Sequence, residues 1–254
     1  MKISNHEKLL KTKVFFCHNK WPHFNLLFDD IEKLRKNKKF KDIIALERGG
    51  LYGSISLFKP FFINKNFISI DCSSKKIFKR GGYNKKLVEN DKIIKMPIDY
   101  HRNYKNLKLK NNSVDLIIIP NLMHHIFDFS KLFKQCFKAL KKNGKIYIFE
   151  PLLREIHQAP DDYFRFSPFA MERALKQAGF SLTKKNYSGG PFTAAIYCLD
   201  QATQYLPKKL RANFIKNFYK KNYKIFLKLE KKYDKNLIRK HTFFPVSFSV
   251  FGKK

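Results

Sequence analysis

The sequence contains few cysteines, and their spacing excludes two kinds of fold. Its 254 residues include only four cysteines, which lie far apart and form no C-x-x-C pair. Disulfide frameworks and cysteine-based zinc sites use closer, paired spacings. Apolar runs are also short, and none approaches the length that spans a membrane. We therefore expect a cytoplasmic protein with reduced thiols and no transmembrane segment.

Acidic residues are scarce beside basic ones, with 20 Asp and Glu against 53 Lys and Arg and a net charge of +33. Such a balance suggests a nucleic-acid partner, because basic side chains neutralise phosphates. However, only nine of the 53 are Arg, the better bidentate ligand of phosphates and bases. The lysines are spread along the whole chain together with many Asn, Ile, Phe and Tyr. We favour a general compositional bias and leave RNA open as an alternative partner.

Short apolar runs alternate with amphipathic segments, which predicts an α/β fold with a mostly parallel sheet covered on both faces. The Ile-rich runs suit strands that are buried on both sides. Strands are expected at 42–46, 67–71, 92–96, 114–119, 145–149, 180–185 and 242–251. Helices are expected at 23–39, 129–142 and 168–178, with two more between 191 and 240.

Glycine is also sparse, yet three of the ten glycines fall directly after the first expected strand, in "IIALERGGLYGSIS". Glu47 stands at the junction, followed by Gly49, Gly50 and Gly53. A glycine turn at this place lets the backbone approach a ligand closely, and the next helix offers its N-terminal amides. The turn is not a phosphate-binding loop of the G-x-x-x-x-G-K-[ST] type, because no Gly-Lys-Ser/Thr follows.

The second expected strand ends at Asp71, 71 − 53 = 18 residues after Gly53. This is close to the separation of about 20 residues between a glycine turn and a ribose-binding carboxylate. A carboxylate there can accept hydrogen bonds from both ribose hydroxyls. Together the turn and Asp71 predict a nucleoside site.

From about residue 40 to 183 the chain resembles the class I S-adenosylmethionine-dependent methyltransferases of the small-molecule type. Four segments carry the resemblance: "ALERGGLYG", "FISID", "NNSVDLIIIPNLMHHIFDFSKLFKQCFKALKKNGKIYIFEP" and "DDYFRFSPFAMERALKQAGF". The resemblance implies a Rossmann-like, doubly wound sheet of seven strands, mostly parallel with an antiparallel last strand. It also implies that S-adenosylmethionine lies across the carboxyl ends of the strands.

We expect one methyltransferase domain over 1–254, with a helical insertion before the last strand. Its expected parts are an N-terminal helical segment at 1–40, a Rossmann-like core at 41–186, a helical lid at 187–241 and the last strand at 242–254. An insertion at this position naturally overhangs the cleft. Contact of the Lys- and aromatic-rich segment 208–233 with a membrane surface is the less favoured alternative.

The resemblance also assigns roles on the cofactor side of the site. Glu47 and Gly49 would lie beside the methionine part, Asp71 would hold the ribose and Asp99 would approach the adenine. The expected cofactor-binding set is Glu47, Gly49, Gly50, Gly53, Asp71, Asp99, Pro120 and Asn121. Leu51 departs from the family pattern, because a middle glycine usually stands there and a Cβ restricts the turn.

The polar segment 150–168 follows the fifth expected strand and is the expected acceptor side. His157 is the leading general-base candidate and His125 the second, because a histidine can take a proton near neutral pH. The candidate substrate-binding residues are Arg154, Asp162, Tyr163 and Arg165. The alternative for the two arginines is that they only pair with nearby carboxylates and fix the loop.

No metal is expected. Neighbouring side chains such as His124 and His125 at a helix start should not share a face. The sulfonium of the cofactor already provides a good leaving group, so the reaction itself requires no metal.

For the acceptor, we expect an oxygen or nitrogen of a small molecule, in particular a sugar or other glycan precursor. DNA is disfavoured, because "IPNLM" lacks the Asn/Asp-Pro-Pro-aromatic pattern and no cysteine follows a proline. The alternatives are an RNA methyltransferase and a non-catalytic binding module of the same fold.

Overall fold

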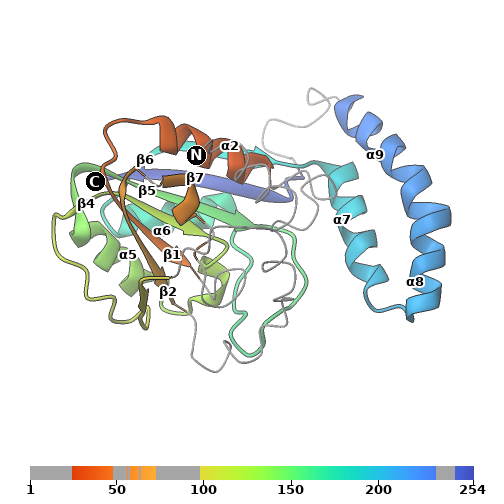
Figure 1. The fold of residues 1–254 in the computed structure, drawn as a ribbon, viewed down its shortest axis with the longest axis horizontal. Helices are drawn as coiled ribbons and strands as arrows, with labels where there is room; N and C mark the ends of the chain where they lie inside the picture. Colours follow the sequence, from red (N-terminus) through yellow and green to blue (C-terminus); the bar gives the residue numbers. More distant parts are fainter. Residues whose placement is uncertain (1–24, 48–55, 57, 63, 73–97, 233–243) are drawn as a thin grey trace.

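The architecture is a seven-stranded sheet with helices on both faces, seen edge-on in Figure 1. The computed structural model describes residues 25–47, 56, 58–62, 64–72, 98–232 and 244–254. The strand order is β3-β2-β1-β4-β5-β7-β6, and β7 alone runs in the direction opposite to the other strands. The strands are β1 Asp42–Glu47, β2 Asn66–Asp71, β3 Tyr100–His101, β4 Val114–Pro120, β5 Leu140–Pro151, β6 Ser181–Ser188 and β7 Ser247–Lys253. The expected fold class is confirmed.

Two layers of helices cover the sheet. The helical elements are α2 Asn25–Lys36, η3 Lys59–Phe62, η4 Met123–His125, α5 Phe129–Ala139, α6 Pro168–Gln177, α7 Pro191–Thr203, α8 Lys208–Phe214, the π-helical η5 Ile215–Tyr219 and α9 Lys220–Lys232. Helix α2 and η3 pack on one face, and α5 and α6 pack on the other. Because side chains alternate along a strand, Ile117 and Ile119 of β4 join one apolar core, and Leu116 and Ile118 join the other.

Helices α5 and α6 begin at side-chain caps that the sequence contains. Asp128 accepts a hydrogen bond from Lys131 N, and Ser167 accepts one from Ala170 N. Each cap satisfies one amide that the helix itself leaves unpaired. Pro168 at the first position of α6 fits because its missing N–H is not needed there. These caps fix where the segments leave the carboxyl edge of the sheet.

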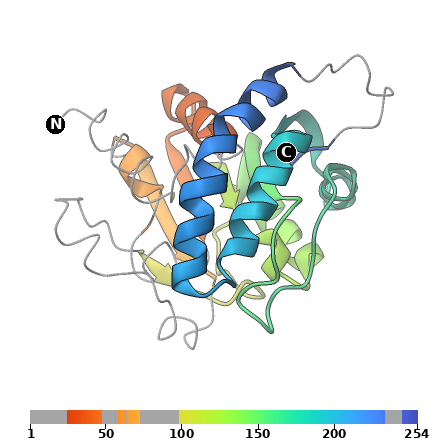
Figure 2. The same ribbon diagram turned by 90° about the vertical axis from the view of Figure 1, so that its right-hand side faces the viewer.

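Helices α7, α8 and α9 project from the sheet, and Figure 2 shows α7 and α9 side by side. They occupy most of the expected insertion at 187–241, whose end lies beyond the described part of α9. Among the residues that the structure describes, no helix is both long enough and apolar enough to cross a bilayer.

Several expected boundaries were wrong, including the end of the helix expected at 23–39, which stops at Lys36, and the start of the strand expected at 145–149, which begins at Leu140. The helix expected to reach residue 142 ends at Ala139, because Leu140 turns to an extended conformation and pairs with Val114 at the start of β4. The last strand begins only at Ser247, so Pro245 precedes it instead of interrupting it. The strand expected at 92–96 lies outside the described residues. The two-residue β3 is too short to leave a sequence pattern.

A buried carboxylate ties α2 to the far edge of the sheet. Asp30 is 1% exposed and accepts a hydrogen bond from Ser249 Oγ at 2.6 Å. Asn186 Nδ2 lies 3.3 Å from both of its oxygens. Burial raises the pKa of Asp30, and the two hydrogen bonds only partly oppose that shift.

We predict that Asp30→Asn raises the free energy of unfolding at pH 7. The amide keeps the shape and the contacts with Ser249 and Asn186 but removes a buried negative charge. Because the folded pKa is raised, the wild type loses stability as pH rises through that pKa, whereas the variant does not. Urea unfolding at pH 7 and pH 4 should therefore show a gain that shrinks at the lower pH. An equal gain, or a loss, at both values would contradict this explanation.

Candidate active site

The parallel strands β1, β2 and β4 end at one edge of the sheet, where Figure 1 shows their arrowheads pointing the same way. Glu47 and Asp71 are the last residues of β1 and β2 and are paired in register. Both carboxylates are buried, with Glu47 3% and Asp71 0% exposed. Open α/β sheets bind ligands at this edge. The structure thus brings together two of the predicted cofactor residues.

Glu47 contacts the chain where it returns from the glycine turn. Its Oε1 accepts a hydrogen bond from Ser56 Oγ at 2.6 Å, and the same hydroxyl accepts one from Lys59 N at 3.1 Å. This contact positions the start of η3 against the end of β1. Gly49, Gly50, Leu51 and Gly53 lie outside the described residues.

Asp71 lies against His101, with 3.4 Å between Asp71 Oδ2 and His101 Nδ1. Neither composition nor spacing had pointed to His101, which the two-residue pairing of β2 with β3 brings to this edge.

Asp99 is exposed, and its carboxylate is turned toward β2. Its Oδ2 accepts from Ser69 N at 2.8 Å, and its Oδ1 lies 2.5 Å from Lys59 Nζ. An adenine contact at Asp99 would compete with this ion pair.

The end of β4 holds a strained residue. Asn121 follows the buried Pro120 and has φ 49°, in the left-handed region that asparagine tolerates better than most residues. Its backbone N donates to Phe149 O of β5 at 2.7 Å. Among the described residues, its buried Oδ1 has no hydrogen-bond partner. A buried amide oxygen without a donor is unfavourable, so a ligand that supplied one would be stabilised here.

The turn that follows Asn121 is held by a single buried carboxylate, that of Glu150. Glu150 lies near the end of β5 and is 1% exposed. Its Oε1 accepts from Leu122 N at 2.8 Å and from Met123 N at 2.7 Å. Its Oε2 lies 2.6 Å from His124 Nδ1. Glu150 thus joins the end of β5 to the turn after β4 and fixes the orientation of His124.

Three histidines meet beside this turn. The ring centroids of His124 and His125 are 4.0 Å apart, and that of His157 lies 5.1 Å from the first and 4.9 Å from the second. Burial and the charge of Arg154 lower the pKa of His157 to about 4, so this ring is neutral at pH 7. The expectation that adjacent side chains would diverge is wrong, because the hydrogen-bond partners of the two rings, Glu150 Oε2 and Asp161 O, set where the imidazoles lie, and not the pitch of the 3-10 turn at 123–125.

Loop 150–168 is fixed over this turn by Arg165 and by two backbone bonds. Tyr163 N and Phe164 N both lie within hydrogen-bonding distance of His124 O, at 2.9 and 3.3 Å. All five guanidinium N–H groups of Arg165 are used within the loop, on Asp162 Oδ1 and Oδ2 and on the carbonyl oxygens of Arg154, Glu155 and Phe164. These bonds favour the alternative that Arg165 shapes the loop.

Asp162 takes part in the same hydrogen bonds that fix loop 150–168. Besides Arg165, it accepts from His157 N at 2.8 Å. Burial raises the pKa of Asp162, but the bonds from Arg165 and His157 outweigh burial and hold it well below its usual range. The carboxylate therefore stays charged, and it holds His157 in place.

The other two acceptor-side candidates differ in exposure. Arg154 is half-buried, and its Nε lies 3.2 Å from Glu155 Oε1. Tyr163 is 43% exposed, and its hydroxyl donates to Asp161 Oδ1 at 3.0 Å. Glu155 also accepts from Tyr197 OH of α7 at 2.9 Å, which links the helical insertion directly to this loop.

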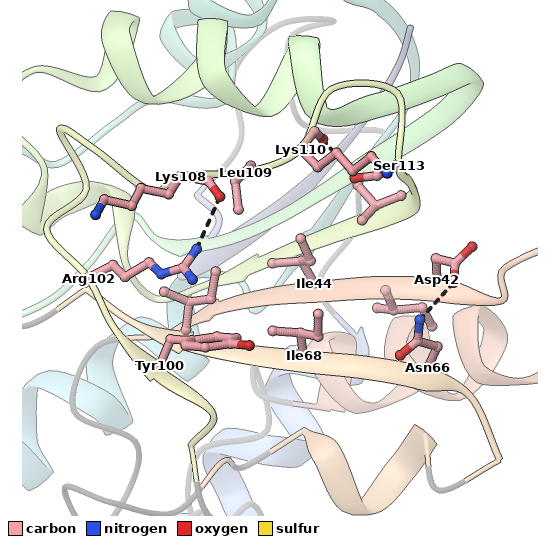
Figure 3. A pocket seen from close by; sticks show the side chains of 13 residues that line it. Asp42, Ile44, Asn66, Ile68, Tyr100, Arg102, Lys108, Leu109, Lys110 and Ser113 are labelled. Atoms are coloured by element: carbon pink, nitrogen blue, oxygen red, sulfur yellow. Dashed lines mark hydrogen bonds between the residues drawn. The ribbon is translucent and has the colours of Figure 1, made fainter.

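A cavity of about 300 Å³ lies elsewhere, against one face of the sheet. Figure 3 shows Ile44 and Ile68 on its floor and Tyr100 and Arg102 at one side. Asp42 and Asn66 line its far end, and these residues begin β1 and β2. The cavity therefore runs along the strands from their amino ends to Ile70 and Tyr100, which immediately precede Asp71 and His101.

Comparisons with known proteins agree with this architecture. Residues 52–148 match the family described as methyltransferase domain. No curated protein matches the sequence. A proposed methyltransferase from Bacillus halodurans is similar in structure, with a TM-score of 0.52, 13% identity and coverage of 89% of this chain and 97% of that one. A proposed sarcosine dimethylglycine methyltransferase from Galdieria sulphuraria has a TM-score of 0.50 and 11% identity over 90% of this chain and 83% of its own.

A third similar structure contains the methyl donor. Phosphoethanolamine N-methyltransferase 2 of Haemonchus contortus, in complex with S-adenosyl-L-methionine, has a TM-score of 0.51 and 14% identity. The match covers 98% of this chain and 60% of that one. At these identities the likeness to solved structures establishes the fold.

We predict that Asn121→Gly retains the fold but impairs the site. Glycine adopts a positive φ without strain, so unfolding by urea should show little loss of stability. The variant loses the amide whose Oδ1 is buried without a partner among the described residues, so ligand binding or turnover should fall about tenfold, as expected for one hydrogen bond. Asn121→Ala is the matched variant that adds backbone strain. Full function in Asn121→Gly would exclude the amide from the site.

Proposed function

We propose that this chain, of which residues 52–148 match a methyltransferase domain, is a class I S-adenosylmethionine-dependent methyltransferase that transfers a methyl group to an oxygen or nitrogen of a small molecule. The observation that carries the proposal is the pairing of two buried carboxylates, Glu47 and Asp71, at the edge that also holds the polar loop 150–168. One group of residues then serves the cofactor and a second group serves the acceptor.

The residues on the cofactor side fit S-adenosylmethionine chemically. Asp71 provides a charged acceptor for the ribose hydroxyls, and Glu47 provides one for the methionine ammonium group. Pro120 and Asn121 would line the cleft between the strand ends and the acceptor. The cofactor, when bound, supplies an activated methyl group on a sulfonium. What remains for the protein is to hold the acceptor in line with that methyl carbon.

On the acceptor side we propose that His125 and His157 contact the group that is methylated, with Arg154 and Tyr163 binding the rest of the acceptor. Arg165 and Asp162 act by holding the loop. A neutral His157 can take up a proton, although a pKa of about 4 makes it a weaker base than an ordinary histidine. Helices α7–α9 would form a lid, a proposal supported by the bond from Tyr197 to Glu155.

A sugar or glycan precursor is the acceptor that we propose first, because a polar loop with charged and aromatic side chains suits a hydroxyl-rich ligand. A screen with labelled S-adenosylmethionine against sugar nucleotides, small amines and total RNA tests this choice. Transfer to a sugar or amine supports the proposal. Label found only in RNA would favour the alternative, and no transfer together with firm cofactor binding would favour a non-catalytic module.

We predict that Asp71→Asn weakens S-adenosylmethionine binding by about 1.5–3 kcal/mol, or roughly 10- to 150-fold, because a charge-assisted acceptor becomes neutral. Calorimetry on the purified variant measures this loss. Glu172→Gln is the matched control, because Glu172 lies on α6 and pairs there with Lys176 and Lys185. Equal affinity of the wild type and Asp71→Asn would show that the cofactor binds elsewhere.

We further predict that His157→Gln lowers kcat while the cofactor affinity stays within about twofold of the wild type. Loss of an acid–base group lowers rates by about 10²–10⁴-fold, and the low pKa of His157 places the expected loss near 10²-fold. Ile156→Ala, at a neighbouring side chain that is 81% exposed, controls for disturbance of the loop. Cofactor binding lost together with activity would make His157 a structural support of the cleft.

A further inference from the structure

The three histidines beside the Glu150 turn have the composition of a metal site. One ligand atom of each, from His124, His125 and His157, lies within 4.8 Å of those of the other two. Two of the rings are buried and the third is partly buried. Because they come from the turn after β4 and from loop 150–168, both ends of the cluster are anchored to the sheet.

Each imidazole ring is oriented by a hydrogen-bond acceptor that faces its Nδ1 atom. His124 Nδ1 lies 2.6 Å from Glu150 Oε2, His125 Nδ1 lies 2.5 Å from Asp161 O, and His157 Nδ1 lies 3.1 Å from Glu155 O. A carbonyl oxygen can only accept, so Nδ1 carries the proton in His125 and His157. The Glu150 carboxylate, which already accepts two backbone N–H groups, sets the same tautomer in His124. A neutral ring of this tautomer offers a lone pair at Nε2.

Two of these lone pairs face each other. His124 Nε2 and His157 Nε2 are 3.3 Å apart, and neither has a proton to donate in the tautomers set above. Two such atoms repel at this distance unless a cation lies between them. In a tetrahedral zinc site, Zn–N bonds of about 2.0–2.1 Å place neighbouring nitrogens about 3.3–3.4 Å apart. The observed separation therefore matches two ligands of one ion.

We propose that His124, His125 and His157 bind one divalent transition-metal ion of the zinc class through their Nε2 atoms. Imidazole ligands suit zinc and its neighbours in the first row. Ligating histidines usually donate their second N–H to a carboxylate or a backbone carbonyl, and all three do so here. Three protein nitrogens leave the fourth tetrahedral position for an oxygen ligand, as in catalytic zinc sites.

Side chains of both charges surround the cluster, and the two carboxylates beside the rings favour a bound cation. Glu150 lies directly behind His124, and Asp162, whose charge Arg165 partly offsets, lies 3.3 Å from His157 Nδ1. Arg154 opposes the ion, since its positive charge acts on His157, but its Nε lies 3.2 Å from Glu155. A metal here would reverse the expectation from sequence that no metal binds. It would also occupy the Nε2 lone pair of His157, so in the metal-bound protein His157 would be a ligand and could not act as the base proposed above.

The experiment is a titration of the full-length protein, stripped with a chelator, with Co²⁺ and Zn²⁺ in the absence of cofactor. We expect one tightly bound ion per chain, measured after desalting, and visible Co²⁺ absorption typical of a four-coordinate nitrogen and oxygen site. Zn²⁺ should displace the Co²⁺ and abolish the absorption. If the unmodified chain binds no stoichiometric ion, the proposal is wrong.

Variants then assign the ion to this cluster. His157→Gln should lose at least tenfold in metal affinity, and Glu150→Gln about 10–100-fold through the orientation of His124. His101→Ala, which removes a histidine at the end of the neighbouring β3, should bind the ion as the unmodified chain does. Circular dichroism of the metal-free proteins checks that each variant is folded. An ion retained in folded His157→Gln, or lost in His101→Ala, would overturn the assignment.

Discussion

The carboxylate of Glu150 is the constraint on which this edge of the molecule depends. It is almost fully buried and accepts three hydrogen bonds, two from backbone amides after β4 and one from His124. Leaving any of these groups unpaired in the interior would be unfavourable. The turn is therefore held to the end of β5. Asn121, immediately before this turn, has a left-handed backbone conformation and is held there by the hydrogen bond from its backbone N–H to Phe149 O.

This arrangement divides the carboxyl edge of the sheet into two parts. The ends of β1 and β2 present carboxylates suited to a nucleoside with a positively charged tail. The ends of β4 and β5 present imidazoles held by carboxylate and carbonyl oxygens, under a loop that is braced by Arg165. Donor and acceptor of the methyl group would thus be held by different strands of one rigid sheet, which favours orientation over flexibility.

The sequence predicted the buried strands, whose residue pattern is local, and missed the features that depend on contacts between residues far apart in the chain. Ile-rich runs located β1, β2 and β4, because strands buried on both faces need continuous apolar residues. The strand ends in turn placed Glu47 and Asp71 together. The convergence of His157 with His124 and His125 depends on the path of a loop whose bonds join residues 26 to 36 positions apart. No local pattern encodes such a path, and the end of α5 was likewise decided by pairing with β4.

A crystal structure with S-adenosylhomocysteine bound would show directly where the cofactor lies. We predict the ribose at Asp71, the amino acid part beside Glu47 and the sulfur directed toward Asn121 and the histidine turn. A ligand bound beside Asp42 and Asn66, at the amino ends of β1 and β2, would contradict this prediction.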